Sequence, residues 1–274
     1  MAKSHIIGID LGTSNCALCT ATLGEGGAAG VVNIPQITSP SVVDEKSGLP
    51  SALYLSNEGE FPEQALTLPW HEVSPNYAVG HFARTHGALA TNRLVTSAKS
   101  WLSNPHIDPR SAVLPWGSTI TDEEKVSALD ATTRYLEHLL AAVQYQQPDT
   151  ALDDAAVIIT VPASFEEVAR NLTLEAAEQA GFGEVVLLEE PQAAFYAWVN
   201  AVGDGWREQV TPGDIVLVCD VGGGTTDFSL IAVTESDGQL GLERISVGEH
   251  LLLGGDNIDL ALAYIAQAQL ADAG

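Results

Sequence analysis

Basic residues are scarce in this chain of 274 residues: 11 Lys and Arg stand against 36 Asp and Glu, for a formal net charge of −25. Proteins bind nucleic acids and anionic membranes through positive patches. The scarcity of basic residues therefore predicts that neither is a partner. A small anion would have to be held by local donors and a metal ion, against an unfavourable overall field.

Long apolar runs and paired cysteines are lacking too. No apolar run approaches the roughly 18 residues of a membrane span, and Asp10 interrupts the apolar stretch near the N-terminus, so we expect no signal peptide. The 3 cysteines show no disulfide pattern, which favours a reducing compartment and predicts a cytoplasmic protein. Cys16 and Cys19 form a C-x-x-C, but residues three apart in a strand point to opposite faces. We therefore expect two separately buried thiols rather than a redox or zinc pair.

Two segments with the same pattern lie far apart in the chain. One reads Gly8-Ile9-Asp10-Leu11-Gly12-Thr13-Ser14-Asn15, and the other reads Cys219-Asp220-Val221-Gly222-Gly223-Gly224-Thr225-Thr226-Asp227. Each is an apolar strand that ends in Asp, followed by a glycine turn, hydroxyl side chains and another apolar strand. The glycines permit close backbone approach and let N–H groups converge on an anion. The pattern predicts two facing hairpins that clamp the phosphates of a nucleotide.

The carboxylates of these segments predict a metal ion. An Asp beside a polyphosphate is repelled unless a cation lies between them, so Asp10, Asp220 and Asp227 imply a divalent metal. Mg²⁺ fits because it prefers oxygen ligands, keeps several waters and binds substrate phosphates. Two ordinary glycine hairpins with surface carboxylates would show the same pattern, and neither a Walker loop nor a dinucleotide fingerprint is present. The hydroxyl donors of the turns are Thr13, Ser14, Thr225 and Thr226.

The rest of the chain alternates strands and helices. We expect strands at residues 5–10, 15–23, 29–34, 51–55, 156–161, 185–188, 215–220, 226–233 and 240–247. We expect helices at 80–102, from the Thr121/Glu124 capping box towards Pro148, from the Ser164/Glu167 capping box to Gly181, after Pro191, and from Gly254-Gly255-Asp256 onwards. Two halves that begin alike suggest a duplicated α/β lobe with the ligand between the lobes.

The sequence resembles the ATPase domain of the seventy-kilodalton heat-shock chaperones (DnaK type), in the actin and sugar-kinase superfamily. The resemblance covers nearly the whole chain. It implies an α/β, actin-like ATPase fold of duplicated ribonuclease H-like lobes, with lobe I at residues 1–205 and a truncated lobe II at 206–274. It rests on five blocks in the family's order: residues 8–13, Ile159-Thr160-Val161-Pro162-Ala163, Glu190-Pro191-Gln192-Ala193-Ala194, residues 220–227 and Leu253-Gly254-Gly255-Asp256.

The resemblance also implies a site for ATP or ADP with Mg²⁺, and ATP hydrolysis by the full-length protein. Asp10 and Asp220 would hold the hydrated metal. Glu190 and Asp227 would orient the metal waters and the attacking water, and Thr225 would lie near the γ-phosphate. The residues implied in nucleotide binding are Gly12, Thr13, Ser14, Asn15, Gly222, Gly223, Gly224, Thr225, Thr226, Gly254 and Gly255.

Two further residues match a relay in the family, and two depart from its pattern. Pro162 and Arg170 match the pair that carries the nucleotide state towards a substrate domain. The family's catalytic lysine falls at Arg84, which is bulkier and always protonated, so we expect ATP to be gripped with slower or differently arranged hydrolysis. Lys99 is the alternative cation. Val186 stands where the family often has an arginine for its J-domain partner, which puts a conventional J-protein contact in doubt.

The chain ends before the family's helical subdomain, adenosine-binding loop and peptide-binding domain. We therefore expect an N-terminal fragment with weak nucleotide affinity and impaired ATPase activity. An unfolded client protein would bind through the missing C-terminal domain, and a co-chaperone remains a possible partner.

The sequence leaves three other functions open. They are a sugar or acetate kinase with a small-molecule acceptor, an actin-like filament or cell-shape protein, and a nucleotide sensor that binds without hydrolysis. The segment Val161-Pro162-Ala163-Ser164-Phe165 and the Glu190-Pro191 block favour the chaperone, whereas Arg84 favours the sensor.

Overall fold

The computed structural model describes residues 3–24, 29–148, 151–236, 239–248, 251 and 253–272. The chain divides into two compact units, Met1–Ile159 with Glu166–Leu187, and Thr160–Phe165 with Leu188–Gly274. Both contain helices and sheets, as the predicted α/β class requires. The division into lobes at residue 205 stays a prediction. No helix in the described ranges combines the length and the apolar character that a bilayer span needs.

The first unit is built on a six-stranded sheet. Its main path runs β11-β10-β1-β2-β3, and β6 pairs with β2. β1 and β2 form an antiparallel hairpin in which Leu11 lies opposite Cys16. Ile7, Ile9 and Leu11 are buried, so every second side chain of β1 enters the core. The strands are β1 (His5–Leu11), β2 (Asn15–Thr22), β3 (Gly30–Val31), β6 (Gly48–Pro50), β10 (Ala155–Val161) and β11 (Val185–Glu189).

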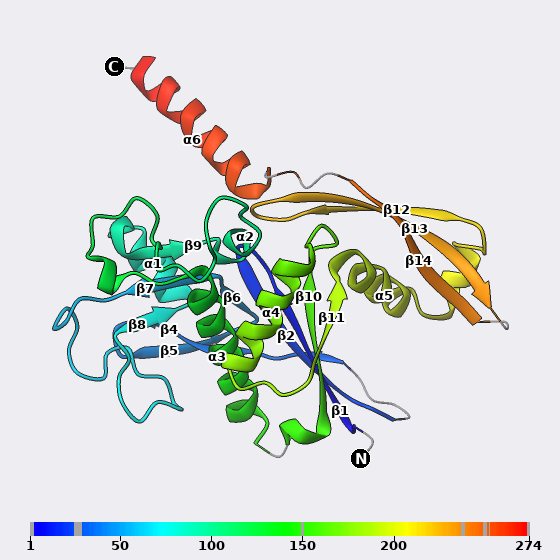
Figure 1. Cartoon of the computed structure of the whole chain (residues 1–274), viewed down its shortest axis with the longest axis horizontal. Helices are drawn as coiled ribbons and strands as arrows, with labels where there is room; N and C mark the ends of the chain where they lie inside the picture. The colour runs from blue at the N-terminus through cyan, green and yellow to red at the C-terminus, as the bar shows by residue number, and fades with distance from the viewer. Residues whose placement is uncertain are drawn as a thin grey trace. The chain divides into compact units, whose positions relative to one another are not determined.

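Helices α3 (Ala128–Gln146) and α4 (Glu167–Gln179) cover one face of this sheet (Figure 1). α3 begins at a capping box: the Ser127 Oγ accepts the Asp130 N–H at 2.9 Å, and the Asp130 carboxylate accepts the Ser127 N–H at 3.1 Å. Two N–H groups that a helix start leaves without partners are thereby satisfied. Leu136 and Leu139 are fully buried in the same core as the β1 side chains.

Smaller sheets and short helices complete the first unit. β7 (Ala52–Leu55) pairs with β8 (Tyr77–Val79) and with β9 (Leu94–Thr96), and β4 (Ile34–Ser39) pairs with β5 (Val42–Lys46). The short helices are α1 (His81–Gly87) and α2 (Ala98–Leu102), and single 3-10 turns lie at Thr91–Arg93, Asp122–Glu124 and Leu152–Asp154.

The second unit centres on a three-stranded antiparallel sheet, in the order β12 (Ile215–Val221), β13 (Thr226–Ser236) and β14 (Gln239–Val247). α5 (Glu190–Val202) packs beside β12 and is followed by the 3-10 segment Gly203–Glu208; α6 (Gly255–Asp272) comes last. Pro191 lies in the first turn of α5, as predicted.

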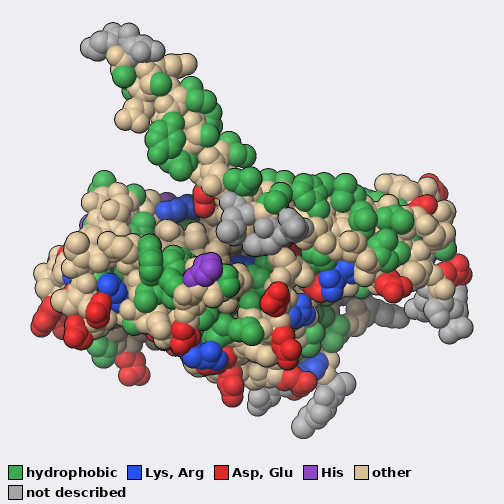
Figure 2. All heavy atoms as spheres, turned by 45° about the horizontal axis from the view of Figure 1, so that its top comes forward, with side chains coloured by type: hydrophobic (Ala, Val, Ile, Leu, Met, Phe, Trp, Pro, Cys, Tyr) green, Lys and Arg blue, Asp and Glu red, His purple; other side chains and the backbone are tan. Residues whose placement is uncertain are grey.

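The second unit exposes large apolar side chains. On α6, Ile258, Leu262 and Tyr264 are each more than half exposed, and Figure 2 shows hydrophobic side chains along this helix. Ile215 and Leu217 of β12 are 60% and 57% exposed. A helix that is apolar on several faces is usually buried. On α6 these side chains are exposed instead, so the helix presents an apolar surface to its surroundings.

Four predicted elements were wrong in their bounds. The helix expected at 80–102 is interrupted by β9, because residues 94–96 pair with β7. The Thr121 capping box exists but closes one 3-10 turn, and the helix begins after Ser127 instead. α4 begins at Glu167 with Glu166 as its N-cap, rather than at Ser164. The strand expected at 29–34 is divided between β3 and β4.

Candidate phosphate-binding site

The turn between β1 and β2 is fixed by one buried serine. The Ser51 Oγ donates to the Gly12 carbonyl at 2.7 Å, and the Ser51 N–H donates to the Ser14 carbonyl at 3.0 Å. The C=O and N–H of a trans peptide point in opposite directions. The N–H groups of Thr13 and Asn15 are therefore directed away from Ser51, which makes them candidate donors to an anion. Ser51 lies 39 residues from Gly12, and no sequence signal connects the two.

The thiol behind this turn is held in its neutral form. Cys16 is buried, and its Sγ lies 3.3 Å from the Ser51 Oγ. Burial raises the pKa of the Cys16 thiol to about 11, and the charges of Asp10 and Lys99 also act on it. Burial likewise raises the pKa of Cys19. Both thiols are therefore protonated at neutral pH, and the buried Lys99 is close enough to influence this side of the turn.

A fully buried glutamine sets the start of α1. The Gln36 Nε2 donates to the Gly48 carbonyl at 2.8 Å, and its Oε1 accepts the His81 N–H at 3.0 Å. Gly80, just before the helix, has a φ of 89°, which favours glycine. A Cβ at Gly80 would also lie 2.7 Å from the Gln36 Oε1. The glycine and the glutamine together fix where α1 begins and thus where Arg84 lies.

Arg84 reaches the first turn. Its Nη1 donates to the Asn15 Oδ1 at 3.2 Å, and both side chains are exposed. Because a guanidinium stays protonated at every physiological pH, this bond holds a permanent positive charge beside the Thr13 and Asn15 donors. The sequence singled out Arg84 and Asn15 separately, and the structure brings them together.

The second hairpin closes in the second unit. Val221 lies opposite Thr226, and the Gly222 N–H donates to the Thr225 carbonyl at 2.8 Å. Asp220 and Asp227 lie directly opposite each other in the β12–β13 register. Residues in such a pair share one face with Cβ atoms about 5 Å apart, where like charges repel. Two carboxylates so placed fit a nearby cation.

The start of α6 is docked onto this second turn. The Gly255 N–H donates to the Gly222 carbonyl at 2.9 Å, and the Asp256 N–H donates to the Gly223 carbonyl at 2.8 Å. A Cβ at Gly254 would lie 2.5 Å from the Gly223 carbonyl oxygen, so only glycine fits there. The Gly254 N–H donates to the Asn257 Oδ1 at 2.9 Å, so the N–H groups of Gly254 and Gly255 both have acceptors here, and their assignment to the nucleotide stays a prediction.

The Thr226 hydroxyl makes a further bond between these segments. Its Oγ1 donates to the Leu253 carbonyl at 2.7 Å, and its N–H donates to the Leu251 carbonyl at 2.9 Å. The segment before α6 is thus fastened to β13 by side chain and backbone. This occupies the Thr226 hydroxyl, which the sequence assigned to the nucleotide.

Other predicted residues lie elsewhere in the two units. Glu190 is the first residue of α5, next to Glu189, whose carboxylate pairs with the Arg244 Nε at 2.7 Å. This ion pair ties the start of α5 to β14 and was not foreseen from the sequence. Pro162 is buried in the second unit, whereas Arg170 lies on α4 in the first. Their relay stays a prediction.

The donor set suits a hydrated metal better than a protein cage. In the described ranges no group of three or more His, Cys, Asp or Glu side chains could hold a metal ion. Each hairpin nevertheless contributes carboxylates beside its turn, Asp10 in the first and Asp220 with Asp227 in the second. Mg²⁺ is bound in this manner, through one or two carboxylates, waters and substrate phosphates.

The sequence model of the Hsp70 protein family matches residues 66–272. The chain belongs to the Hsp70 family. This membership agrees with the resemblance drawn from the five sequence blocks, and it implies an actin-like ATPase fold and nucleotide binding. The first hairpin and Ser51 precede the matched range, whereas Arg84, the second hairpin and the start of α6 lie inside it.

Individual Hsp70 relatives are chaperones of bacteria. The chain is 28% identical over 277 residues to the chaperone protein HscA of Shigella boydii. This match covers 97% of the chain and 38% of that protein. It is 29% identical over 200 residues to the chaperone protein HscA homolog of Delftia acidovorans, covering 69% of this chain and 30% of that protein. The chain thus spans about a third of the length of the curated relatives it matches.

Proposed function

We propose that this chain is the nucleotide-binding part of an ATP-dependent chaperone and that its glycine hairpins hold the phosphates of ATP or ADP with Mg²⁺. The observation that carries the proposal is the Arg84–Asn15 bond at 3.2 Å. It places a permanent cation beside a turn whose N–H groups are turned away from the core. In a chain with net charge −25, such a local arrangement suits an anion that the overall field would repel.

The residues of the first unit would act by binding and orienting phosphate oxygens. The N–H groups of Thr13 and Asn15 would donate to them, and Arg84 would supply charge. Asp10 would accept hydrogen bonds from metal-bound water. When bound, Mg²⁺ would neutralise charge on the phosphates, and positioning with charge stabilisation is what phosphoryl transfer chiefly needs.

The hairpin of the second unit would bind phosphate through its own donors. The N–H groups of Gly223 and Gly224 would face phosphate, and Asp220 and Asp227 would hold waters between them. Thr225 would lie near the γ-phosphate, and Glu190 would orient the attacking water. The fastening of Gly222 and Gly223 to α6 supports this role, because a turn that is already ordered loses less entropy on binding.

Client binding and regulation concern the whole protein. We infer that it binds unfolded protein through a further domain, with Pro162 and Arg170 relaying the nucleotide state. Val186 is 56% exposed on β11, so an apolar side chain stands on the surface where the family often has an arginine. A partner of the conventional J-domain type would lose that charge contact.

Calorimetric titration of ATP and ADP, with Mg²⁺ and with EDTA, tests the proposal. We expect both nucleotides to bind this chain and the full-length gene product, more tightly with Mg²⁺, and more weakly in this chain. Binding that ignores Mg²⁺ would contradict the metal assignment. No binding by the full-length product would leave a degenerate actin-like scaffold as the better account.

A nucleotide sensor is the second candidate, and the same arginine favours it. The hydrogen bond to Asn15 restrains the Arg84 guanidinium, which is bulkier than the lysine ammonium of the family. A restrained guanidinium can bind the phosphates of ATP, but it cannot move to stabilise the negative charge that develops on them during hydrolysis. The sensor and the ATPase therefore differ in turnover rather than in affinity.

We expect Arg84→Ala to weaken ATP binding about ten- to hundredfold, because hydrogen bonds to charged groups contribute about 1.5–3 kcal/mol. ADP binding should change less if the guanidinium meets the γ-phosphate. Titration of both nucleotides measures the difference, and single-turnover hydrolysis by Arg84→Lys shows whether the restrained guanidinium limits the rate. Arg110→Ala, which removes a surface partner of Glu175, is the control. Equal losses in Arg84→Ala and Arg110→Ala would mean that Arg84 acts only through net charge.

A further inference from the structure

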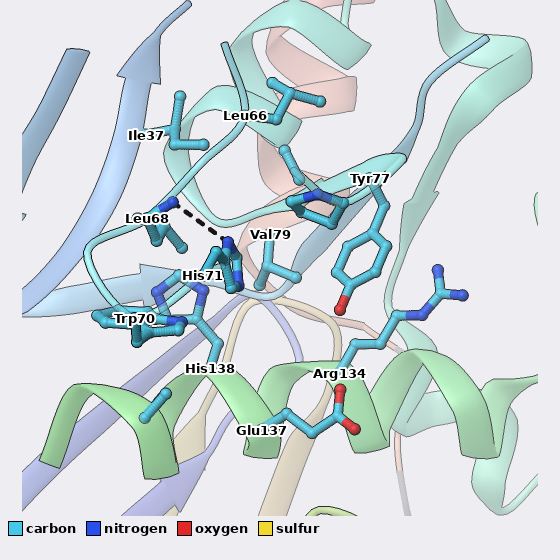
Figure 3. A pocket seen from close by; sticks show the side chains of 13 residues that line it. Ile37, Leu66, Leu68, Trp70, His71, Tyr77, Val79, Arg134, Glu137 and His138 are labelled. Atoms are coloured by element: carbon cyan, nitrogen blue, oxygen red, sulfur yellow. Dashed lines mark hydrogen bonds between the residues drawn. The ribbon is translucent and has the colours of Figure 1, made fainter. Parts of the chain in front are cut away.

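A pocket of the first unit shares no lining residue with either hairpin. It has a volume of about 170 Å³ and opens between residues 66–79 and the middle of α3 (Figure 3). The helix contributes Arg134, Glu137, His138 and Ala141, whose spacing puts them on one face. None of the pocket's lining residues belongs to the candidate phosphate site.

One part of this pocket is lined by aliphatic side chains and aromatic rings. Four large aliphatic side chains in this part are at most 6% exposed, and they are Ile37, Leu66, Leu68 and Val79. Trp70 and Tyr77 lie on opposite sides, with two imidazoles next to Trp70 (Figure 3). A cavity of about 150 Å³ with aliphatic and aromatic walls is large enough to hold benzene. The pocket therefore has room for one six-membered ring.

The ring walls are held by their neighbours. The Trp70 ring meets the His138 ring edge to face at 5.3 Å and 86°, and the His71 ring at 6.0 Å and 79°. On the other side, the Arg134 guanidinium lies 4.3 Å from the centre of the Tyr77 ring. Such contacts fix ring orientations, so the cavity is formed before any ligand arrives.

The two imidazoles have fixed and complementary tautomers. The His138 Nε2 lies 2.9 Å from the Pro35 carbonyl, which only accepts, so Nε2 carries the hydrogen. Burial lowers the pKa of His138 to about 4, and the neutral ring keeps an acceptor at Nδ1. The His71 Nδ1 accepts the Leu68 N–H at 3.2 Å, and burial lowers its pKa as well, so Nε2 of His71 is a donor.

One imidazole acceptor and one imidazole donor match a hydroxyl group, which both donates and accepts. The charged side chains at the rim, Arg134 and Glu137, have opposite signs and stand on the same helix. A charged ligand would meet side chains of both signs among the lining residues, so no net countercharge would offset its lost hydration. We propose that this pocket binds a small uncharged phenol, with the ring between Trp70 and Tyr77 and the hydroxyl at the two imidazoles.

Titration of phenol into the ¹⁵N-labelled chain, followed by two-dimensional ¹H–¹⁵N spectra, tests the proposal. We expect saturable shift changes confined to residues 66–79 and 134–141. Ala141→Leu, which fills the pocket, should abolish them, whereas Gln144→Leu, at an exposed position of the same helix, should keep them. Benzoate and benzylammonium should give no saturable change.

Three results would overturn the proposal: no saturable change with phenol, unchanged binding by Ala141→Leu, or binding of either charged compound as tightly as phenol. If Ala141→Leu does not fold, His71→Phe replaces it. That variant keeps a ring but removes the donor, so phenol affinity should fall about tenfold while benzene affinity stays the same. Equal losses for phenol and benzene would contradict the assigned hydroxyl contacts.

Discussion

Gly254→Ala is expected to destabilise the second unit by about 1–3 kcal/mol, the range typical of forcing a methyl group into a filled space. The new Cβ would lie 2.5 Å from the Gly223 carbonyl oxygen and 2.6 Å from that of Gly222. Backbone atoms cannot turn aside as a flexible side chain can. The start of α6 must therefore separate from the second turn.

The neighbouring glycine supplies a matched control. A Cβ at Gly255 meets its nearest atom at 3.8 Å, an ordinary contact, so Gly255→Ala should change the stability by less than about 1 kcal/mol. Urea unfolding gives the free energies, and hydrogen exchange at positions 255 and 256 reports whether the bonds to Gly222 and Gly223 survive. Equal stability of the two variants would show that α6 is not docked as described.

Asp10→Asn should weaken ATP binding when Mg²⁺ is present and should not weaken it when Mg²⁺ is removed. With Mg²⁺, the lost carboxylate weakens the hydrogen bonds to metal-bound water, and affinity should fall about ten- to hundredfold. With EDTA, the same change removes a negative charge beside the phosphates, so the variant should bind ATP at least as well as the wild type. Asp220→Asn should behave alike.

Only a carboxylate that acts through a cation gives this crossover. Asp44→Asn, at an exposed carboxylate that accepts the Thr38 hydroxyl at 2.7 Å, controls for the change in net charge and should show no reversal. Calorimetric titrations of the four proteins under both conditions provide the measurement. If Asp10→Asn loses the same affinity with Mg²⁺ and with EDTA, Asp10 does not act through a metal ion.

The hairpins could be predicted because their signals are local. Apolar runs followed by glycine turns gave strands at 5–10 and 215–220, and the structure has His5–Leu11 and Ile215–Val221. Family membership followed from the same blocks. The roles assigned to Asp10, Glu190 and the other site residues stay predictions, since they depend on a bound nucleotide.

What the sequence missed was decided by distant partners. One helix was expected over residues 80–102, yet Leu94–Thr96 forms β9 because it pairs with β7. Ser51 and Gln36 carry no local signal, although one orients the first turn and the other sets the start of α1. Thr121 matched a capping pattern, but its box closes only a 3-10 turn. The long helix α3 begins at the second capping box, that of Ser127.

The docking of α6 on the second turn makes the helix a lever. Its 18 residues extend about 27 Å at 1.5 Å per residue, and its pivot is the pair of bonds from positions 255 and 256 to the turn. A tilt of about 10° at that pivot would carry the far end of a helix of this length through about 5 Å. A small rearrangement of Gly222 and Gly223 is thereby magnified at the apolar surface of α6, far from the atoms that move first.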